Sequence, residues 1–416
     1  MLSLANRNFV TWIDKGMILF ILIFFFSEIW SHNYANGGGL PPILGIYLVF
    51  GYGLVRLFIQ IDIFKELTKV GYFWWLFFFF LLLTANYIIV RLGLFHLYEN
   101  DLQDVFNRRL TALGFSLSSL ILLLNKEVYK FARLGVVIAV IFGTFINVLD
   151  IFDLTEKWGG AQLRAAGYYM NPNTSAIVLS MGFILTIDIV KKSLRLPYFL
   201  VYLLGALLPL SRGAFPVVFL IILYVLFKGM LSLKSLVITG CIGAIVGVVL
   251  SAFIMKNENT GMVLDMLSRN RSVQNRIATI FAPGETKFNA GVRDEVALDH
   301  LLHYAKSPIV GHGLSSSVYI QKNITLTNHS SHVLYIHMLN DYGIIGWLIL
   351  FGMPFSLLIY ANKIRWDMVI IIFGITYGIA GVSSHNLYDL RCFLFIYALV
   401  AAYRMHESRD KPLQVE

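Results

Sequence analysis

"GYFWWLFFFFLLLTANYIIVR", residues 71–91, decides the class of fold. The stretch carries a single charge, at Arg91, and it is long enough to cross the hydrocarbon core of a bilayer as one helix. The rest of the chain has the same character, since 57% of its 416 residues are hydrophobic and only 14% are charged. Soluble domains are about a quarter charged. The sequence therefore predicts an all-α membrane protein that crosses the bilayer many times.

Twelve apolar runs are candidates for transmembrane helices, although two of them could form one broken unit around Arg212. The N-terminal run lacks the small-residue cleavage site of a signal peptide, so we expect it to be a retained helix. Both cysteines, Cys241 and Cys392, fall in predicted spans, which argues against a disulfide framework or a zinc site. The candidates are residues 12–30, 40–58, 71–91, 109–125, 132–152, 174–190, 197–211, 213–228, 234–255, 343–361, 367–384 and 388–403.

Lysine and arginine orient these spans, because they collect in cytoplasmic loops. With the N-terminus in the cytoplasm, every predicted inner segment holds a basic residue, and the outer loops before residue 256 are sparser. This anchoring explains most of the net charge of +9, so the charge gives no reason to expect a nucleic-acid partner. We expect four parts: residues 1–152 with the first five helices, 153–255 with four more, a large periplasmic loop at 256–342, and 343–416 with three helices and a cytoplasmic tail.

The large outer loop is predicted to be structured. It carries eight basic residues, which fit either a solvated loop near anionic headgroups or a site for an anionic substrate. Its segment "VRDEVALDHLLHYAKSP" (292–308) has apolar residues near helical spacing, and Pro308 stops the helix. Those apolar residues are Val296, Leu298, Leu301, Leu302 and Ala305.

A smaller outer loop contains "LRAAGYYMNPNTSA" (163–176). Asn171-Pro172-Asn173 is a turn signal. We expect Asn173 or Thr174 to be the N-cap of the helix that follows, because asparagine and threonine side chains accept hydrogen bonds from the first backbone amides of a helix.

Four motifs occur in order in this predicted twelve-span chain: "RAAGYYMNPNTSA" (164–176), "SRGA" (211–214), "VRDEVALDHLLHYAKSPIVGHG" (292–313) and "SHVLYIHMLNDYGIIGW" (331–347). Together they resemble the bacterial O-antigen ligase and O-antigen polymerase superfamily, over roughly residues 160–350. The resemblance implies metal-independent glycan transfer at the outer face of the cytoplasmic (inner) membrane, without a cofactor. It implies a glycan donor on undecaprenyl diphosphate. The implied acceptor is a sugar hydroxyl, either of lipid A-core or of another lipid-linked glycan.

The resemblance also assigns site residues. Arg212 and Arg293 match the family's functional arginines, and His332 matches its functional histidine. Gly343 and Gly346 follow His332 at the spacing of the ligase motif, in which the residue after the histidine is Asn, Ser or Gln. Here that residue is Val333, and the departure weakens the distinction between ligase and polymerase.

Elementary chemistry agrees with these residue types. A diphosphate leaving group gains negative charge as the glycosidic bond breaks, and guanidinium groups stabilise it without a metal. A histidine of near-neutral pKa suits a base that activates an acceptor hydroxyl. A charge at a membrane edge, such as Arg212, is costly unless it is paired, so we expect it to hold phosphate rather than only reach the interface.

Further candidates are weaker. Arg164 is either a third diphosphate contact or a solvated side chain, and His329 is the rival of His332 as base. Asp389 and Arg391 either pair with each other or contact the substrate. We expect His300 and His303, an i,i+3 pair, to form a helix face and not a metal site, and no metal ligands are predicted.

Three functions fit the sequence to different degrees. The leading interpretation is an inverting glycosyltransferase that ligates finished O-antigen to lipid A-core in lipopolysaccharide biosynthesis. The near-equal alternative is the polymerase that extends the chain from the same donor. A transporter of lipid-linked sugars is less favoured, because the two halves show no internal repeat and the charges of interest lie at one face.

Overall fold

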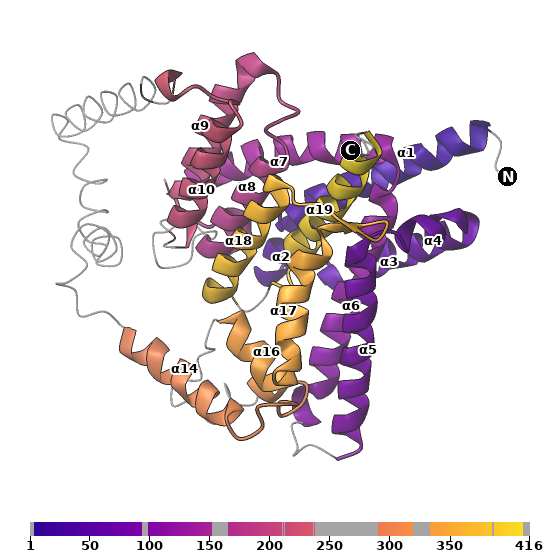
Figure 1. Cartoon of the computed structure of the whole chain (residues 1–416), viewed down its shortest axis with the longest axis vertical. Coiled ribbons are helices and arrows are strands. Elements are labelled where there is room, and N and C mark those ends of the chain that lie inside the picture. Colours follow the sequence, from indigo (N-terminus) through magenta and orange to yellow (C-terminus); the bar gives the residue numbers. More distant parts are fainter. Residues whose placement is uncertain are drawn as a thin grey trace. The chain divides into compact units, whose positions relative to one another are not determined.

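The structure is a computed structural model that describes residues 4–93, 99–151, 165–209, 211, 213–235, 237, 290–318, 333–384 and 387–410. These residues are mostly helical (Figure 1), with one short antiparallel pair of strands. The chain divides into two compact units. Unit 1 comprises residues 1–139 and 289–416, and unit 2 comprises residues 140–288.

Unit 1 holds most of the long helices. Its first helix passes into a π-helical turn, and its two strands form a hairpin after α17. The described elements are α1 (Leu4–Ile21), η1 (Leu22–Phe26), α2 (Ile29–Ala35), α3 (Pro42–Ile59), α4 (Asp62–Leu67), α5 (Gly71–Arg91), α6 (Glu99–Leu123), the first half of α7 (Lys126–Ile151), α14 (Ala290–Tyr304), α16 (Leu334–Tyr342), α17 (Ile345–Ser356), β1 (Ile359–Tyr360), β2 (Lys363–Ile364), α18 (Met368–Ser383) and α19 (Arg391–Asp410).

Unit 2 is described from the second half of α7 to the end of α10. Its helices are shorter and strongly apolar. After α7 it contains η3 (Gly167–Tyr169), α8 (Pro172–Ile184), η4 (Lys192–Leu194), α9 (Arg195–Leu207) and α10 (Ala214–Phe227).

Helix α19 is the central helix of unit 1. Between Cys392 and Ala402 every side chain is buried, on all sides of the helix. A helix that is apolar all round belongs inside a protein or a membrane. Helices α6 and α5 and the turn η1 pack against it.

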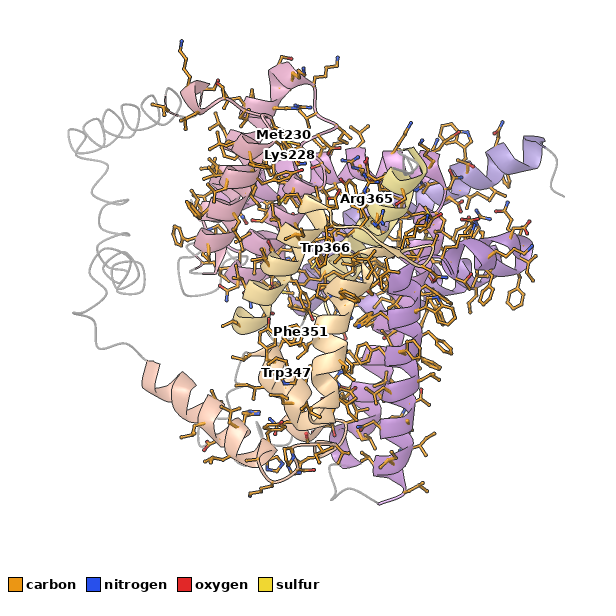
Figure 2. All side chains as sticks on the ribbon, in the orientation of Figure 1. Lys228, Met230, Trp347, Phe351, Arg365 and Trp366 are labelled. Carbon is orange, nitrogen blue, oxygen red and sulfur yellow. The ribbon has the colours of Figure 1, made fainter. Side chains whose placement is uncertain are left out.

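Outer helices instead present large apolar side chains outward. Trp74 and Phe78 of α5 are exposed, and so are Trp347 and Phe351 of α17, whose rings lie with centroids 4.8 Å apart (Figure 2). In water such surfaces would promote aggregation, whereas lipid solvates them. The structure therefore agrees with an all-α membrane protein.

The contacts of unit 1 gather at two opposite ends of its helices. At the end we call inner, Arg56 donates two hydrogen bonds of 2.8 Å to Asp14. There His406 also lies with Nε2 3.0 Å from the carbonyl oxygen of Leu123. The sequence places all four residues toward the cytoplasmic side, so these contacts join residues assigned to one side of the membrane.

The other end, which we call outer, is held by a second set of contacts. Arg109 donates to Asp341 over 2.8 Å, and the amide of Leu314 donates to Asn86 over 2.6 Å. The sequence assigns all four residues to the opposite side. Helix α6 therefore runs between the two ends, with Arg109 at the outer one and Leu123 at the inner one.

Within the described residues, four helices are long and apolar enough to cross a membrane: Asn8–Phe26, Pro42–Ile59, Gly71–Arg91 and Lys126–Asp150. Four shorter apolar helices accompany them, at Pro172–Ile184, Ala214–Phe227, Ile345–Ser356 and Met368–Val382. The predicted span 234–255 lies largely outside the described residues, so a total of twelve crossings stays a prediction. The span predicted at 343–361 is shorter than expected, because α17 ends at Ser356 and the hairpin follows.

Candidate active site

The helix predicted in the large outer loop is present as α14, Ala290–Tyr304. Its buried face differs from the expected one. Val296 and His300 are buried, whereas Leu298, Leu301 and Leu302 are exposed. The leucines therefore do not form the contact of α14 with the protein, and a histidine does.

Helix α14 packs against α16 through this histidine. The rings of His300 and His337 are stacked with centroids 5.5 Å apart. Asn340 Nδ2 donates to the carbonyl oxygen of His300 over 3.1 Å, and the amide of His312 donates to the carbonyl oxygen of Asn340 over 2.8 Å. Three segments of the outer loop thus form one packed group (Figure 1), which we call the outer module: α14, the turn at 305–318 and α16.

The turn that follows α14 is bonded to the end of α16. The carbonyl oxygen of Pro308 accepts from the amide of Ile344 over 2.9 Å, two residues past the end of α16, and His312 bonds Asn340 within that helix. The outer module is therefore held both by the contact of His300 with His337 and by the turn.

Of the predicted residues Arg293 and His332, Arg293 falls within a described element. It is in the first turn of α14, seven residues before His300. His332 and its rival His329 lie outside the described residues; α16 begins two positions after His332, at Leu334.

His300 belongs to the face of α14 that packs against the protein, and it is fully buried. Burial lowers the pKa of His300 to about 4, against the opposing charges of Asp341 and Asp299. Burial, followed by the charge of His312, also lowers the pKa of His303 to about 4. Both imidazoles are therefore neutral at pH 7. In the described part of the chain, no group of three or more His, Cys, Asp or Glu side chains could hold a metal ion.

Two motifs of unit 2 meet as well. Asn171, rather than Asn173 or Thr174, caps α8, and its side chain accepts from the amides of both of those residues. Asn173 is occupied elsewhere, since its Oδ1 accepts from Ser211 Oγ over 2.8 Å. Ser211 directly precedes Arg212, and α10 begins at Ala214. The starts of α8 and α10 are thus held side by side by the "NPN" and "SRGA" motifs.

The turn that precedes α8 is fixed by Asp150. Its Oδ2 accepts from the amides of Ala166 and Gly167 over 2.8 and 3.0 Å. Arg164 comes two residues before Ala166, and both Arg164 and Arg212 lie outside the described residues.

Comparison with known families covers the segment that contains these motifs. Residues 197–351 match the O-antigen ligase family. Over these residues the chain is similar to the O-antigen ligase and polymerase superfamily, and the match supports the resemblance noted from the motifs. No curated protein matches the chain. The matched range includes "SRGA", α14, α16 and the beginning of α17.

Similarity to the O-antigen ligase family over residues 197–351 has general consequences for activity. The family implies a glycosyltransferase-like enzyme that takes glycan from a lipid-linked donor to a lipid acceptor in a membrane. Together with the apolar helices, it indicates a multi-pass protein of the inner membrane.

A cluster at the outer end was not predicted from the sequence. Asp341 is fully buried, and its Oδ2 accepts from Arg109 Nη2 over 2.8 Å. Its Oδ1 accepts from Ser316 Oγ over 3.2 Å, and from the amide and Oγ of Ser317 over 3.1 and 3.0 Å. Arg109 also donates to the hydroxyl of Tyr342 over 2.9 Å. The available signal was a charge inside an apolar run, since ionisable residues there are usually paired.

The sequence left open whether Asp389 pairs with Arg391. In the described part of the chain, Asp389 forms its ion pair with Arg108, whose Nε lies 3.6 Å from Oδ2. Arg391 is the first residue of α19. Consecutive arginines of α6 therefore bind carboxylates from two different outer segments, Asp341 and Asp389.

Proposed function

We propose that the protein is an O-antigen ligase. It transfers glycan from undecaprenyl diphosphate to a sugar hydroxyl of lipid A-core, with inversion at the anomeric carbon, at the periplasmic face of the inner membrane. The observation that carries the proposal is the packing of α14, which contains Arg293, against α16, which begins two residues after His332, inside the family match.

In this proposal His332 is the general base. It takes the proton of the acceptor hydroxyl while that oxygen attacks the anomeric carbon and the bond to the diphosphate breaks. His329 is the alternative base. In this proposal His300 and His337 hold the helices together and take no part in proton transfer.

Arginines receive the leaving group, and in this proposal Arg293, Arg212 and Arg164 bind the diphosphate. The N-termini of α8 and α10, which Asn173 and Ser211 hold together, also favour an anion, because first-turn amides and the helix dipole favour negative charge. Guanidinium groups carry the charge stabilisation, so transfer needs no metal. Asp389, which is paired with Arg108, and Arg391 are further candidates for contact with the substrate.

The polymerase remains the second candidate because of one residue. Val333 stands where the ligase motif has Asn, Ser or Gln. A polymerase would use the same donor and accept glycan onto another lipid-linked repeat. A transporter of lipid-linked sugars would move the donor without making a glycosidic bond.

One reaction separates the three. Purified protein in detergent receives undecaprenyl-diphosphate glycan together with lipid A-core or with a second lipid-linked repeat, and the products are resolved on a gel. A ligase modifies lipid A-core, whereas a polymerase lengthens the lipid-linked glycan. Absence of any glycosidic product from active, folded protein would leave transport as the function.

A further inference from the structure

We infer that Asp341 is a positioning residue for transfer: its carboxylate fixes the outer module on α6, beside the contact of Asn86 from α5, and so sets the position of the two helices that contain or adjoin the candidate residues Arg293 and His332. This inference rests on the proposed transfer reaction. In this role Asp341 does not contact the substrate, and it acts through its hydrogen bonds with Arg109, Ser316 and Ser317.

The carboxylate of Asp341 joins three segments that are far apart in sequence. Oδ2 receives the guanidinium of Arg109 from α6, and Oδ1 receives Ser316 and both donors of Ser317 from the turn. Asp341 itself belongs to the last turn of α16. One side chain therefore fixes α16 to α6 and to the turn at the same time.

A second contact supports the same arrangement from α5. Asn86 Oδ1 accepts from the amide of Leu314 over 2.6 Å, and Asn86 Nδ2 donates to the backbone carbonyl of Asp341 over 3.4 Å. The turn and α16 are thus held by adjoining transmembrane helices. Because α5 and α6 are long helices of the unit 1 core, the outer module takes its position from the membrane domain.

The path from Asp341 to the reacting end is short and rigid. Helix α16 has nine residues, and it begins directly after the position of His332 and Val333. The neighbouring residue Asn340 bonds α14 through the carbonyl oxygen of His300. A rotation of α16 about its contact with Arg109 would therefore displace the segment bearing His332 and the helix bearing Arg293 together.

Asp341 does not act on the substrate directly. It is fully buried, and both of its oxygens already accept hydrogen bonds from cationic, amide or hydroxyl donors. A carboxylate in this state is neither a base nor a ligand for a sugar. Its contribution is geometric, and small displacements of reacting groups by about 1 Å are enough to lower a rate by about a hundredfold.

The test compares Asp341→Asn with a matched variant at the inner end, Asp14→Asn. Both replacements remove the charge from a fully buried carboxylate bonded to an arginine of a transmembrane helix. Transfer is measured with purified full-length protein, undecaprenyl-diphosphate glycan and lipid A-core, together with the thermal midpoint of each variant. We expect Asp341→Asn to lower kcat at least tenfold with the KM for the donor within about twofold. We expect Asp14→Asn to lower the thermal midpoint without such a loss of kcat.

A second pair of variants covers a failure of Asp341→Asn to fold. Ser316→Ala/Ser317→Ala removes two hydroxyl donors to Oδ1 and leaves the ion pair with Arg109. It should lower kcat severalfold, again with little change in KM. If Asp341→Asn folds, the two serine replacements should lower kcat by a smaller factor in that variant than in the wild-type protein, because their partner is already altered.

The outcomes separate this inference from the proposed function. Wild-type protein that transfers no glycan to any acceptor contradicts the proposed function. Active wild-type protein with a normal kcat in Asp341→Asn, or in the serine variant when Asp341→Asn is unfolded, overturns the positioning role. An equal loss of kcat in Asp14→Asn also overturns it, because the loss would then report general destabilisation.

Discussion

In the described part of unit 1, two arginines bind fully buried carboxylates, one at each end of the helices, and the two pairs are built differently. At the inner end Asp14 receives Nε and Nη2 of Arg56 and the hydroxyl of Tyr52, all from helix α3. At the outer end Asp341 receives one nitrogen of Arg109 and otherwise bonds the turn at Ser316 and Ser317. The inner pair joins two helices, whereas the outer pair joins a helix to the loop that carries the candidate site.

This difference separates stability from activity. A buried ion pair contributes little net free energy, but loss of one partner leaves an uncompensated charge and is strongly destabilising. At the inner end, loss of the pair weakens the packing of α1 against α3. At the outer end the same cost is accompanied by displacement of the outer module. Variants at the two ends should therefore differ in kcat more than in thermal midpoint.

The largest effect is expected at the outer end, in His332→Ala. A general base contributes about 10²–10⁴-fold to the rate, so single-turnover transfer should fall by that factor while donor affinity stays nearly unchanged. His329→Ala, measured in the same detergent, should cost much less. If His329→Ala is inactive and His332→Ala transfers normally, the base is His329 and not His332. Loss of donor binding in His332→Ala would make His332 a substrate contact.

The inner pair should give the next largest effect, on stability. Asp14→Asn leaves Arg56 buried without its counter-ion, and breaking such a pair costs about 3–5 kcal/mol. Thermal unfolding of the purified protein measures the change, with the exposed pair Lys65–Asp62 as control, where Asp62→Asn should shift the midpoint little. A midpoint equal to that of wild type in Asp14→Asn would show that the inner end tolerates an unpaired charge.

Replacement of either candidate arginine by lysine should have a smaller effect on the rate of glycan transfer. Arg212→Lys and Arg293→Lys keep the charge but lose the planar fork that binds phosphate through two nitrogens. Each should lower turnover more than about tenfold, on the order of 1.4 kcal/mol of transition-state stabilisation. Arg195→Lys, at the inner start of α9 and bonded to backbone carbonyls, is a control that should stay active. Near-normal turnover in both lysine variants would exclude a fork contact with the diphosphate.

Stability of the outer end should also depend on pH. His300 and His303 have pKa values near 4 in the folded protein, below the usual value of about 6.5, so the unfolded chain binds more protons between these limits. The contribution of these two histidines to the free energy of unfolding is therefore fully present above about pH 6.5, and it is lost as pH falls toward 4. Thermal midpoints across this range should fall less in His300→Gln than in wild type. Identical pH dependence in both would show that His300 does not carry the effect.

The smallest expected effect is that of metal removal. Because guanidinium groups take the role of a cation in the proposed reaction, transfer should continue in EDTA with little loss. The measurement is the gel assay with and without the chelator. Abolition of transfer by EDTA and its recovery with magnesium or manganese would contradict a metal-free mechanism.

The class of fold could be predicted because it depends on local features. Apolar length alone identifies helices such as Gly71–Arg91, and Pro308 follows the end of α14 as expected. The face of α14 was not predicted, since spacing marks a leucine stripe but does not say whether protein or another environment covers it. The same limit applies to the cap of α8: Asn173 had the right chemistry, but its side chain is bonded to Ser211 in a distant part of the chain.

The outer cluster shows a different limit. Arg109 and Asp341 are separated by 232 positions, and no local pattern names a partner at that distance. The sequence pointed to the loop segments that the outer module contains, because its motifs lie within them. It did not identify the carboxylate that joins those segments, since a buried aspartate in an apolar run can bond to any donor that the fold brings near.

The central place of α19 has a consequence for the order in which the protein is made. Helices α5 and α6 and the turn η1 leave the ribosome hundreds of residues before α19 does, yet they pack against it. Chains fold from the N-terminus during synthesis, so these earlier helices must wait in the bilayer with their α19-facing sides against lipid or against the insertion machinery. Folding of unit 1 is therefore completed late, and a nascent chain stalled before Arg391 is held in the membrane without its central helix, α19.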